Sequence, residues 1–270
     1  MLEKRIGFIG GGNMAKAIIG GLVNSGKIAP SSIWIYDRKP ATNQALADQY
    51  GINAAGSAEA LAREVDILFA AVKPNVILKV LNDLAGQLRK DAVVVSIAAG
   101  VTLDSLASVL GHDRKIIRAM PNTPSLVSEG MTSVTPNVLV EQAELEDVVT
   151  IFESFGKAAV LNEYLIHSVV SVSGSAPAYV FMFIEAMADA AVLGGMPRAQ
   201  AYQFAAQAVK GSAQMVLETG KHPAELKDMV CSPGGTTIEA VKVLEEKGFR
   251  AAVIEAMQRC MAKSEKLSGA

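Results

Sequence analysis

This chain has few cysteines, histidines and aromatic residues, and its net charge is close to zero. The 270 residues include two cysteines and three histidines, 5% are aromatic, and the formal net charge is -2. Two cysteines cannot form a disulfide framework, which fits a reducing compartment, and we expect Cys231 and Cys260 to be core thiols. The charge balance gives no reason to bind nucleic acid or an anionic membrane. The near-zero net charge therefore favours a small molecule as the partner.

The few histidines and cysteines are too scattered for metal chemistry. His112, His167 and His222 lack metal-ligand spacing, and no Cys/His cluster occurs. The segment 173–177 also lacks the G-x-S-x-G spacing of a nucleophile elbow. We therefore expect neither a metal site nor a serine hydrolase.

No targeting segment or membrane span is evident. The charged residues 3–5 lead directly into a strand-like run at 6–9, without an apolar signal region. The most apolar later stretch, 176–194, contains Glu185 and Asp189 and falls short of the ~20 apolar residues of a membrane span. We expect it to be a buried helix of a cytoplasmic protein.

Strand and helix patterns alternate over the first 120 residues. The β-branched runs are 6–9, 33–36, 67–70, 93–95 and 115–117, and the helix candidates are 13–25, 42–50, 58–63, 75–89 and 102–110. Strands that are apolar on both faces and alternate with helices predict an α/β fold, a doubly wound parallel sheet covered on both sides. A helix near 141–154 and a strand at 158–161 complete this domain at residue 162.

Beyond residue 162 the apolar residues recur with helical spacing. The segments concerned are 163–171, 176–193, 198–218 and 250–267. We therefore predict two domains, an α/β domain at 1–162 and an all-helical domain at 163–270. The helix around 179–184 is apolar on nearly every face, which a surface helix of a monomer cannot be. A subunit interface explains it, and a central core helix is the alternative.

A glycine-rich turn follows the first predicted strand. Gly10-Gly11-Gly12-Asn13-Met14-Ala15 is a G-x-G-x-x-A sequence at the start of a helix. Gly10 permits the tight turn, Gly12 lets the backbone approach a pyrophosphate, and Ala15 allows close helix-to-strand packing. The helix N-terminus adds unpaired N–H groups and partial positive charge. This turn predicts dinucleotide binding.

Acidic and basic residues meet in the turn after the second predicted strand. Asp37 stands where a carboxylate would bond the ribose 2'-hydroxyl of NAD. Arg38 and Lys39 follow, and either could pair with the 2'-phosphate of NADP. For each residue a solvated turn is the plainer interpretation. The choice between NADH and NADPH stays open.

Further strand ends are expected to line the cofactor crevice, because ligands of open α/β sheets bind outside the carboxyl ends of the strands. These loops are Ala70-Ala71-Val72-Lys73-Pro74, Ser96-Ile97-Ala98-Ala99-Gly100 and Met120-Pro121-Asn122-Thr123-Pro124. Lys73 is charged, and Asn122 could offer its amide to the nicotinamide carboxamide or to substrate. A surface lysine and a proline-rich turn are the simpler alternatives.

Two loops of the helical domain combine small residues with hydroxyls. Val172-Ser173-Gly174-Ser175-Ala176-Pro177 precedes the long apolar helix, and capping alone could explain it. Ser232-Pro233-Gly234-Gly235-Thr236-Thr237 precedes a helix that starts near Ile238. Its exposed amides and hydroxyls are suited to a carboxylate.

Taken in order, these motifs resemble the pyrroline-5-carboxylate reductases of bacterial type. The most specific runs are Arg118-Ala119-Met120-Pro121-Asn122-Thr123-Pro124 and the loop that ends in Gly234-Gly235-Thr236-Thr237. The resemblance implies NAD(P)H-dependent reduction of 1-pyrroline-5-carboxylate to L-proline, the last step of proline synthesis. It also implies a Rossmann-like domain followed by a helical dimerisation domain, in homodimers that can assemble into decamers.

The resemblance also assigns roles to single residues. The pyrophosphate would lie on Gly10 to Ala15, and the nicotinamide half against Ala70, Val72, Lys73, Pro74, Ala98 and Asn122. The substrate would lie among Ser173, Ser175, Gly234, Gly235, Thr236 and Thr237. Thr237 would be the catalytic residue, through a hydrogen bond to the ring nitrogen. NADPH is the implied cofactor and NADH is also possible, since Asp37 departs from the small or neutral residues that many relatives have there.

Two other functions remain as alternatives. A β-hydroxyacid dehydrogenase also joins a Rossmann domain to a helical one, but resembles members that use a lysine of the helical part as acid and base. Lys210 is the only candidate for that lysine on a central helix. A non-catalytic dinucleotide-binding regulator is the other alternative. The elaborated loops at Ser173 and Gly234 argue against the regulator.

Overall fold

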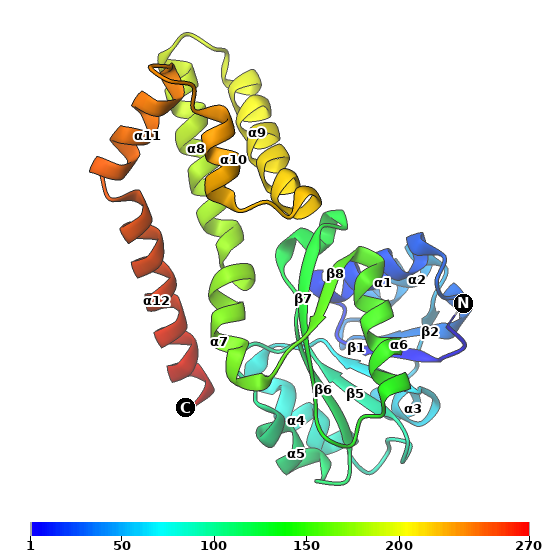
Figure 1. Ribbon diagram of the computed structural model, residues 1–270. Coiled ribbons are helices and arrows are strands. Elements are labelled where there is room, and N and C mark those ends of the chain that lie inside the picture. The colour runs from blue at the N-terminus through cyan, green and yellow to red at the C-terminus, as the bar shows by residue number, and fades with distance from the viewer. Residues whose placement is uncertain (1, 270) are drawn as a thin grey trace. The chain divides into compact units, whose positions relative to one another are not determined.

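The computed structural model describes residues 2–269, which form two compact units (Figure 1). One unit contains the chain up to Gly174 together with the stretch from Cys260, and the other spans Ser175–Arg259. The division falls inside a helical stretch that begins at Glu163. It therefore does not test the domain boundary predicted at residue 162.

The first unit is built on an eight-stranded sheet of order β3-β2-β1-β4-β5-β6-β7-β8. The strands are β1 (Ile6–Ile9), β2 (Ile33–Tyr36), β3 (Asn53–Ala54), β4 (Ile67–Ala70), β5 (Val93–Ser96), β6 (Lys115–Met120), β7 (Gly130–Pro136) and β8 (Gly156–Val160). All neighbours pair in parallel except β6 and β7. The prediction of a wholly parallel sheet is wrong at β7, whose small and hydroxylated residues gave no strand signal.

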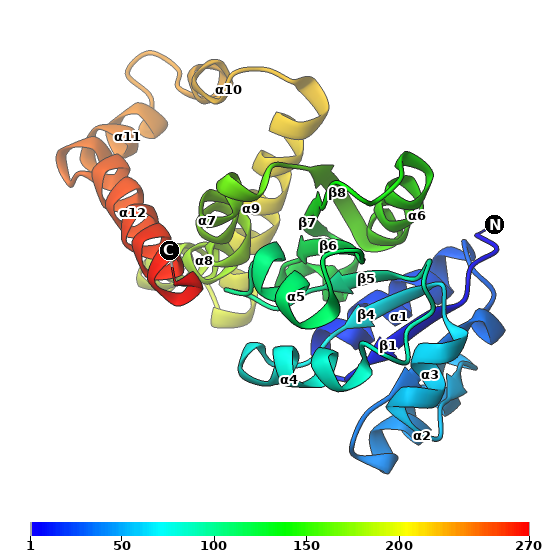
Figure 2. The same cartoon turned by 90° about the horizontal axis from the view of Figure 1, so that it is seen from below.

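Helices cover both faces of this sheet (Figure 2). They are α1 (Asn13–Ser25), α2 (Pro40–Tyr50), α3 (Ala58–Glu64), α4 (Pro74–Leu84), α5 (Leu103–Leu110) and α6 (Gln142–Phe152). The short helix α7 (Ile166–Val169) follows the last strand. Local signals explain several ends: Gly26 caps α1 in the left-handed conformation, and the Ser57 side chain caps α3. The helix predicted at 75–89 ends earlier, at Leu84.

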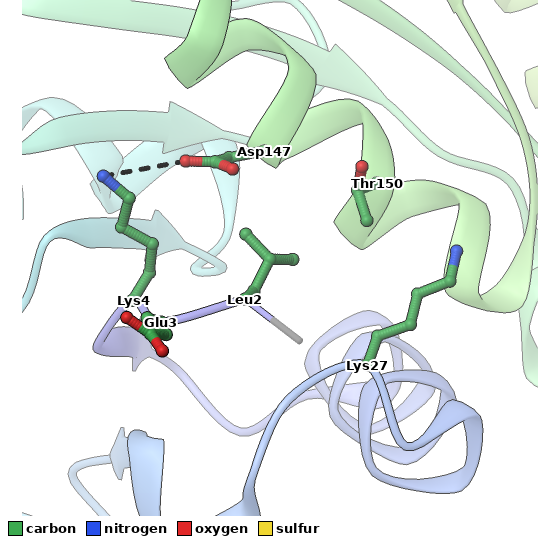
Figure 3. Close-up of a pocket in the computed structure, with 6 residues that line it drawn as sticks. All are labelled: Leu2, Glu3, Lys4, Lys27, Asp147 and Thr150. Atoms are coloured by element: carbon green, nitrogen blue, oxygen red, sulfur yellow. Dashed lines mark ion pairs between the residues drawn. The ribbon is translucent and has the colours of Figure 1, made fainter.

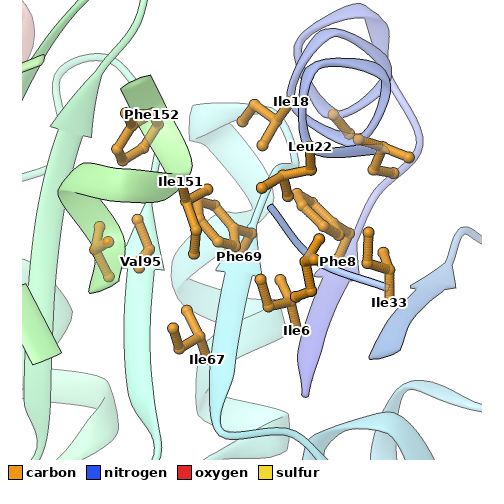
Figure 4. Packing of buried hydrophobic residues seen from close by; sticks show 14 of the residues in the cluster. Ile6, Phe8, Ile18, Leu22, Ile33, Ile67, Phe69, Val95, Ile151 and Phe152 are labelled. Carbon is orange, nitrogen blue, oxygen red and sulfur yellow. The ribbon is translucent and has the colours of Figure 1, made fainter. Parts of the chain in front are cut away.

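Two apolar cores lie on opposite faces of the sheet. Alternate strand residues point to opposite faces, so Phe69 joins the core under α1 and α6 while Leu68 joins the core under α3, α4 and α5. In the first core Phe8 and Phe69 stack with ring centroids 4.9 Å apart, and Phe152 meets Phe69 edge-on at 5.8 Å (Figure 4). This packing fixes the strand ends that carry the candidate cofactor loops.

The second unit is helical, as predicted. Its helices are α8 (Ala176–Leu193), α9 (Arg198–Thr219), α10 (Pro223–Val230), α11 (Thr236–Glu246) and the first part of α12 (Phe249–Ser268). Helices α8 and α9 pack together, and Phe183 of α8 meets Phe249 of α12 with ring centroids 6.1 Å apart. Helix α10 was not predicted; it is short, and His222 caps it by accepting the Ala224 N–H.

Helix α8 is apolar but exposed in the described protomer. Only Ala188 is buried on it, while Phe181, Met182 and Leu193 are 61%, 69% and 90% exposed. The alternative of a core helix buried within one chain is therefore wrong, while the subunit interface stays a prediction. The continuous helix Glu163–Leu193 is long and apolar enough to cross a membrane by length and composition, which for a single helix is weak evidence. Cys231 and Cys260 are half-buried, so the expectation of core thiols is also wrong.

Candidate functional site

The carboxyl ends of four parallel strands meet at one edge of the sheet. The chain leaves β1 at Gly10, β2 at Asp37, β4 at Ala71 and β5 at Ile97. Backbone hydrogen bonds join these ends: Ala71 N–H donates to Ile9 O at 2.8 Å, and Gly10 N–H donates to Tyr36 O at 2.8 Å. The structure therefore brings four of the predicted cofactor loops together.

The three glycines after β1 have different physical roles. Gly10 has φ +99°, and a Cβ there would lie 2.6 Å from the Ala71 carbonyl oxygen. Gly11 is buried, and a Cβ there would collide with Thr42. Gly12 caps α1 in an extended conformation, and no atom lies within 4 Å of a Cβ built on it. The fold requires the first two, whereas Gly12 leaves open space beside the free N–H groups of the helix N-terminus.

This open space fits the pyrophosphate of a dinucleotide. Asn13 is exposed, Met14 is half-buried, and Ala15 is buried against the sheet. An anion can thus approach the backbone N–H groups of the first turn of α1, because the buried side chain of Ala15 points away from it into the sheet and Gly12 has no side chain. The residues present fit the predicted group.

Asp37 is bonded to the backbone of the glycine loop. Its Oδ2 accepts the Gly11 N–H at 2.8 Å, and its Oδ1 accepts the Lys39 N–H at 2.9 Å. Buried Asn43 holds the Asp37 backbone through two hydrogen bonds, at 2.6 and 2.9 Å. Each carboxylate oxygen keeps acceptor capacity for a ribose hydroxyl. The side chains of Arg38 and Lys39 are exposed. The predicted ribose position therefore has a negatively charged carboxylate, from Asp37, and two positively charged side chains next to it.

Sequence reasoning missed the role of Asn43. The residue lies in the first turns of α2, where short polar side chains commonly bond nearby backbone groups. That preference was the available signal.

The nicotinamide-side residues divide into buried and exposed ones. Ala70 and Ala98 are 0% and 4% exposed, so they can offer a ligand little beyond their backbone. Val72 is half-buried, while Lys73 and Pro74 are exposed at the start of α4.

Asn122 is buried and both ends of its amide are engaged. Oδ1 accepts the Met131 N–H at 2.9 Å, and Nδ2 donates to the Ser173 carbonyl oxygen at 3.1 Å. Ser173 lies in the π-helical turn Val170–Gly174. The structure thus joins one predicted cofactor residue to one predicted substrate residue.

An ion pair between buried Arg118 and half-buried Glu163 was not foreseen. Arg118 is 3% exposed, and its Nη1 donates to Glu163 Oε1 at 2.8 Å. The same oxygen accepts the Leu103 N–H at 2.8 Å, at the start of α5. The pair ties β6 to the chain segment that leads into α7. The sequence held no signal for it, because the partners are 45 positions apart.

The remaining predicted substrate residues belong to the second unit, apart from Ser173. Ser175 is half-buried just before α8. Gly234 has φ +66°, Gly235 caps α11, and Thr236 and Thr237 form its first turn. The free N–H groups of that turn can bind a carboxylate.

Two cavities lie at the opposite edge of the sheet, near the amino ends of the strands. One, of about 530 Å³, is lined by Leu2, Glu3, Lys4, Lys27, Asp147 and Thr150, with Lys4 and Asp147 paired at 3.6 Å (Figure 3). The other, of about 160 Å³, includes Ile67 and Val93 at the strand starts. Neither contains a predicted site residue. Between residues 2 and 269, no three His, Cys, Asp or Glu side chains gather to hold a metal.

Comparisons with known proteins agree with this arrangement. Residues 163–267 match the family model described as pyrroline-5-carboxylate reductase dimerisation, and residues 5–100 match the one described as NADP oxidoreductase, coenzyme F420-dependent. The chain is 70% identical to the pyrroline-5-carboxylate reductase of Escherichia coli (strain K12) over 267 residues, 99% of both chains.

Solved structures give the same result over the whole length. The fold superimposes on a pyrroline-5-carboxylate reductase from Coxiella burnetii with a TM-score of 0.94, at 34% identity and 99% coverage of both chains. It superimposes on the pyrroline carboxylate reductase of Plasmodium falciparum with NADP bound with a TM-score of 0.88, at 32% identity and 99% coverage of both chains.

Proposed function

This chain belongs to the pyrroline-5-carboxylate reductase family, and from that membership we propose how its residues serve the reduction of 1-pyrroline-5-carboxylate to L-proline. The protein is an NAD(P)H-dependent oxidoreductase acting on a cyclic C=N bond. The 70% identity to the E. coli enzyme across 99% of both chains carries this assignment. It leaves the β-hydroxyacid dehydrogenase and regulator alternatives without support.

The cofactor is proposed to lie along the carboxyl edge of the sheet. The pyrophosphate binds the free amides at the start of α1, from Gly12 to Ala15, over the open side of Gly12. The nicotinamide half lies against Ala70, Val72, Lys73, Pro74, Ala98 and the Asn122 strand end. When bound, the nicotinamide supplies the hydride, and the protein contributes orientation.

The substrate is proposed to lie among Ser173, Ser175 and the loop from Gly234 to Thr237. The Gly235 N–H donates to the Ser232 carbonyl at 3.0 Å, so the amides of Thr236 and Thr237 bind the substrate carboxylate, in the manner of an anion at a helix N-terminus. The Thr237 hydroxyl bonds the ring nitrogen. A cyclic imine can enter protonated from solvent, so the site needs positioning and charge complementarity rather than a tuned histidine.

The first experiment follows NADPH and NADH oxidation in parallel after racemic 1-pyrroline-5-carboxylate is added to the purified protein. We expect rapid oxidation and L-proline as the product. Absence of oxidation with both cofactors would contradict the proposed reaction.

Replacing Thr237 with alanine is expected to lower kcat about tenfold, because one hydrogen bond to a charged group contributes about 1.5 kcal/mol. Cofactor affinity should stay nearly unchanged. Thr237→Ser keeps the hydroxyl and is the matched control. A normal kcat in Thr237→Ala would remove this residue from the mechanism.

We propose that NADPH is used and that NADH is also accepted. Asp37 opposes a 2'-phosphate, while exposed Arg38 and Lys39 attract it. Asp37→Asn should therefore raise the ratio of kcat/KM for NADPH to that for NADH about tenfold. The substitution keeps an amide oxygen for the Gly11 N–H. Asp91→Asn makes the same charge change at the other end of the strands, and an equal shift there would contradict a local effect.

We also propose a homodimer through the helical domain, which begins at residue 163. The exposed apolar residues of α8 and the dimerisation model over 163–267 support a second copy of the chain as the partner. A homodecamer is the higher assembly, and the location is cytoplasmic, without nucleic acid or membrane as a partner. Light scattering of the purified protein measures the subunit number, and a monomer would contradict the proposal.

A further inference from the structure

The carbonyl of Ser173 receives its hydrogen bond from another segment. Ser173 lies in a π-helical turn just before Ser175, the N-cap of α8. The N–H five positions on, of Ala178, donates to the Ser175 carbonyl at 3.1 Å, and the residue four positions on is Pro177, which has no N–H. The side chain of Asn122 donates to the Ser173 carbonyl instead, at 3.1 Å. Asn122 thus supplies, from the end of β6, a hydrogen bond that the first turn of α8 does not provide.

The other end of the Asn122 side chain is equally fixed. The side-chain Oδ1 accepts the Met131 N–H at 2.9 Å. The main chain of Asn122 is also held, because its carbonyl oxygen accepts the Ser125 N–H at 3.1 Å. A flipped amide would set a donor against the Met131 N–H and an acceptor against the Ser173 carbonyl, so the orientation is determined. With 8% exposure, the side chain is a buried bridge between two backbone segments.

The segment that receives this bond is irregular and closely packed. Val170–Gly174 forms a π-helical turn, a feature frequent at functional sites. The Ser173 hydroxyl donates back to the Val169 carbonyl at 3.1 Å. A Cβ on Gly174 would lie 3.2 Å from the end of the Met120 side chain, so the turn lies directly against the end of β6.

We infer that Asn122 is a positioning residue that holds Ser173 against the cofactor-side end of β6, instead of offering its amide to the nicotinamide. This inference rests on the proposed function, because Ser173 is a substrate residue only under that proposal. Loss of the bridge releases the Ser173 backbone and misplaces the imine relative to the hydride donor, while the glycine loop that binds the pyrophosphate is untouched.

The test is a double-mutant cycle with Asn122→Ala and Pro177→Ala. Asn122→Ala is expected to lower kcat/KM for 1-pyrroline-5-carboxylate about tenfold, with the Kd of NADPH, from fluorescence titration, within about twofold of wild type. Pro177→Ala supplies an N–H four positions after Ser173, and we expect this N–H to donate to the Ser173 carbonyl in place of Asn122. The double variant should therefore recover most of the loss seen in Asn122→Ala.

Two results would overturn the inference. Equal losses in Asn122→Ala and in the double variant, with NADPH affinity reduced in proportion, would identify Asn122 as a direct cofactor ligand. A lower melting temperature with unchanged kcat/KM would reduce it to a purely structural bridge. Failure of the proposed function is seen separately, because the wild-type protein would then reduce no 1-pyrroline-5-carboxylate.

Discussion

Replacing Gly12 with alanine is expected to weaken cofactor binding about a hundredfold without loss of stability. Gly12 has φ -72° and ψ -179°, a conformation that alanine adopts, and a Cβ there meets no atom within 4 Å. The free space around this Cβ is the space in which a pyrophosphate would approach the first turn of α1. The added methyl group would therefore obstruct the ligand and not the fold.

Thermal melting and fluorescence titration with NADPH separate these two effects. Gly56→Ala is the matched control, because a Cβ there also meets nothing within 4 Å. Gly10→Ala is the opposite case: its φ of +99° and the nearby Ala71 carbonyl should make it lose stability as well as binding. An affinity for Gly12→Ala within about threefold of wild type would contradict the proposed pyrophosphate position.

Replacing Glu163 with alanine is expected to lower the free energy of unfolding by about 3 kcal/mol. The change leaves the Arg118 guanidinium buried at 3% exposure without its carboxylate, and the Leu103 N–H without its acceptor. An uncompensated buried charge is costly because it has lost both water and its partner. Denaturant unfolding, followed by circular dichroism, gives the free energy directly.

Two variants control this measurement. Lys4→Ala breaks the exposed pair with Asp147, at 3.6 Å, and should cost less than about 1 kcal/mol. Adding Arg118→Met to Glu163→Ala removes the stranded charge and should regain part of the lost stability. If Glu163→Ala costs no more than Lys4→Ala, the pair of Arg118 and Glu163 does not stabilise the fold.

Local sequence patterns predicted much of the secondary structure. The strands at 6–9, 33–36 and 67–70 and the helices at 13–25 and 176–193 have the predicted bounds. Hydrophobic periodicity and capping residues are local sequence features, so they predict helices and strands without knowledge of the tertiary structure. The antiparallel strand β7 and the short helix α10 were missed, because neither carries a long apolar pattern.

The sequence by itself determined the α/β order, the glycine loop after β1 and the family to which the chain belongs. Tertiary structure alone decided which groups meet: Gly11 with Asp37, Asn122 with Ser173, and Arg118 with Glu163. These partners lie 26, 51 and 45 positions apart, and their pairing depends on the order of strands in the sheet. Tertiary structure also showed that α8 is exposed, because burial depends on what the rest of the chain places against a helix and not on the composition of the helix.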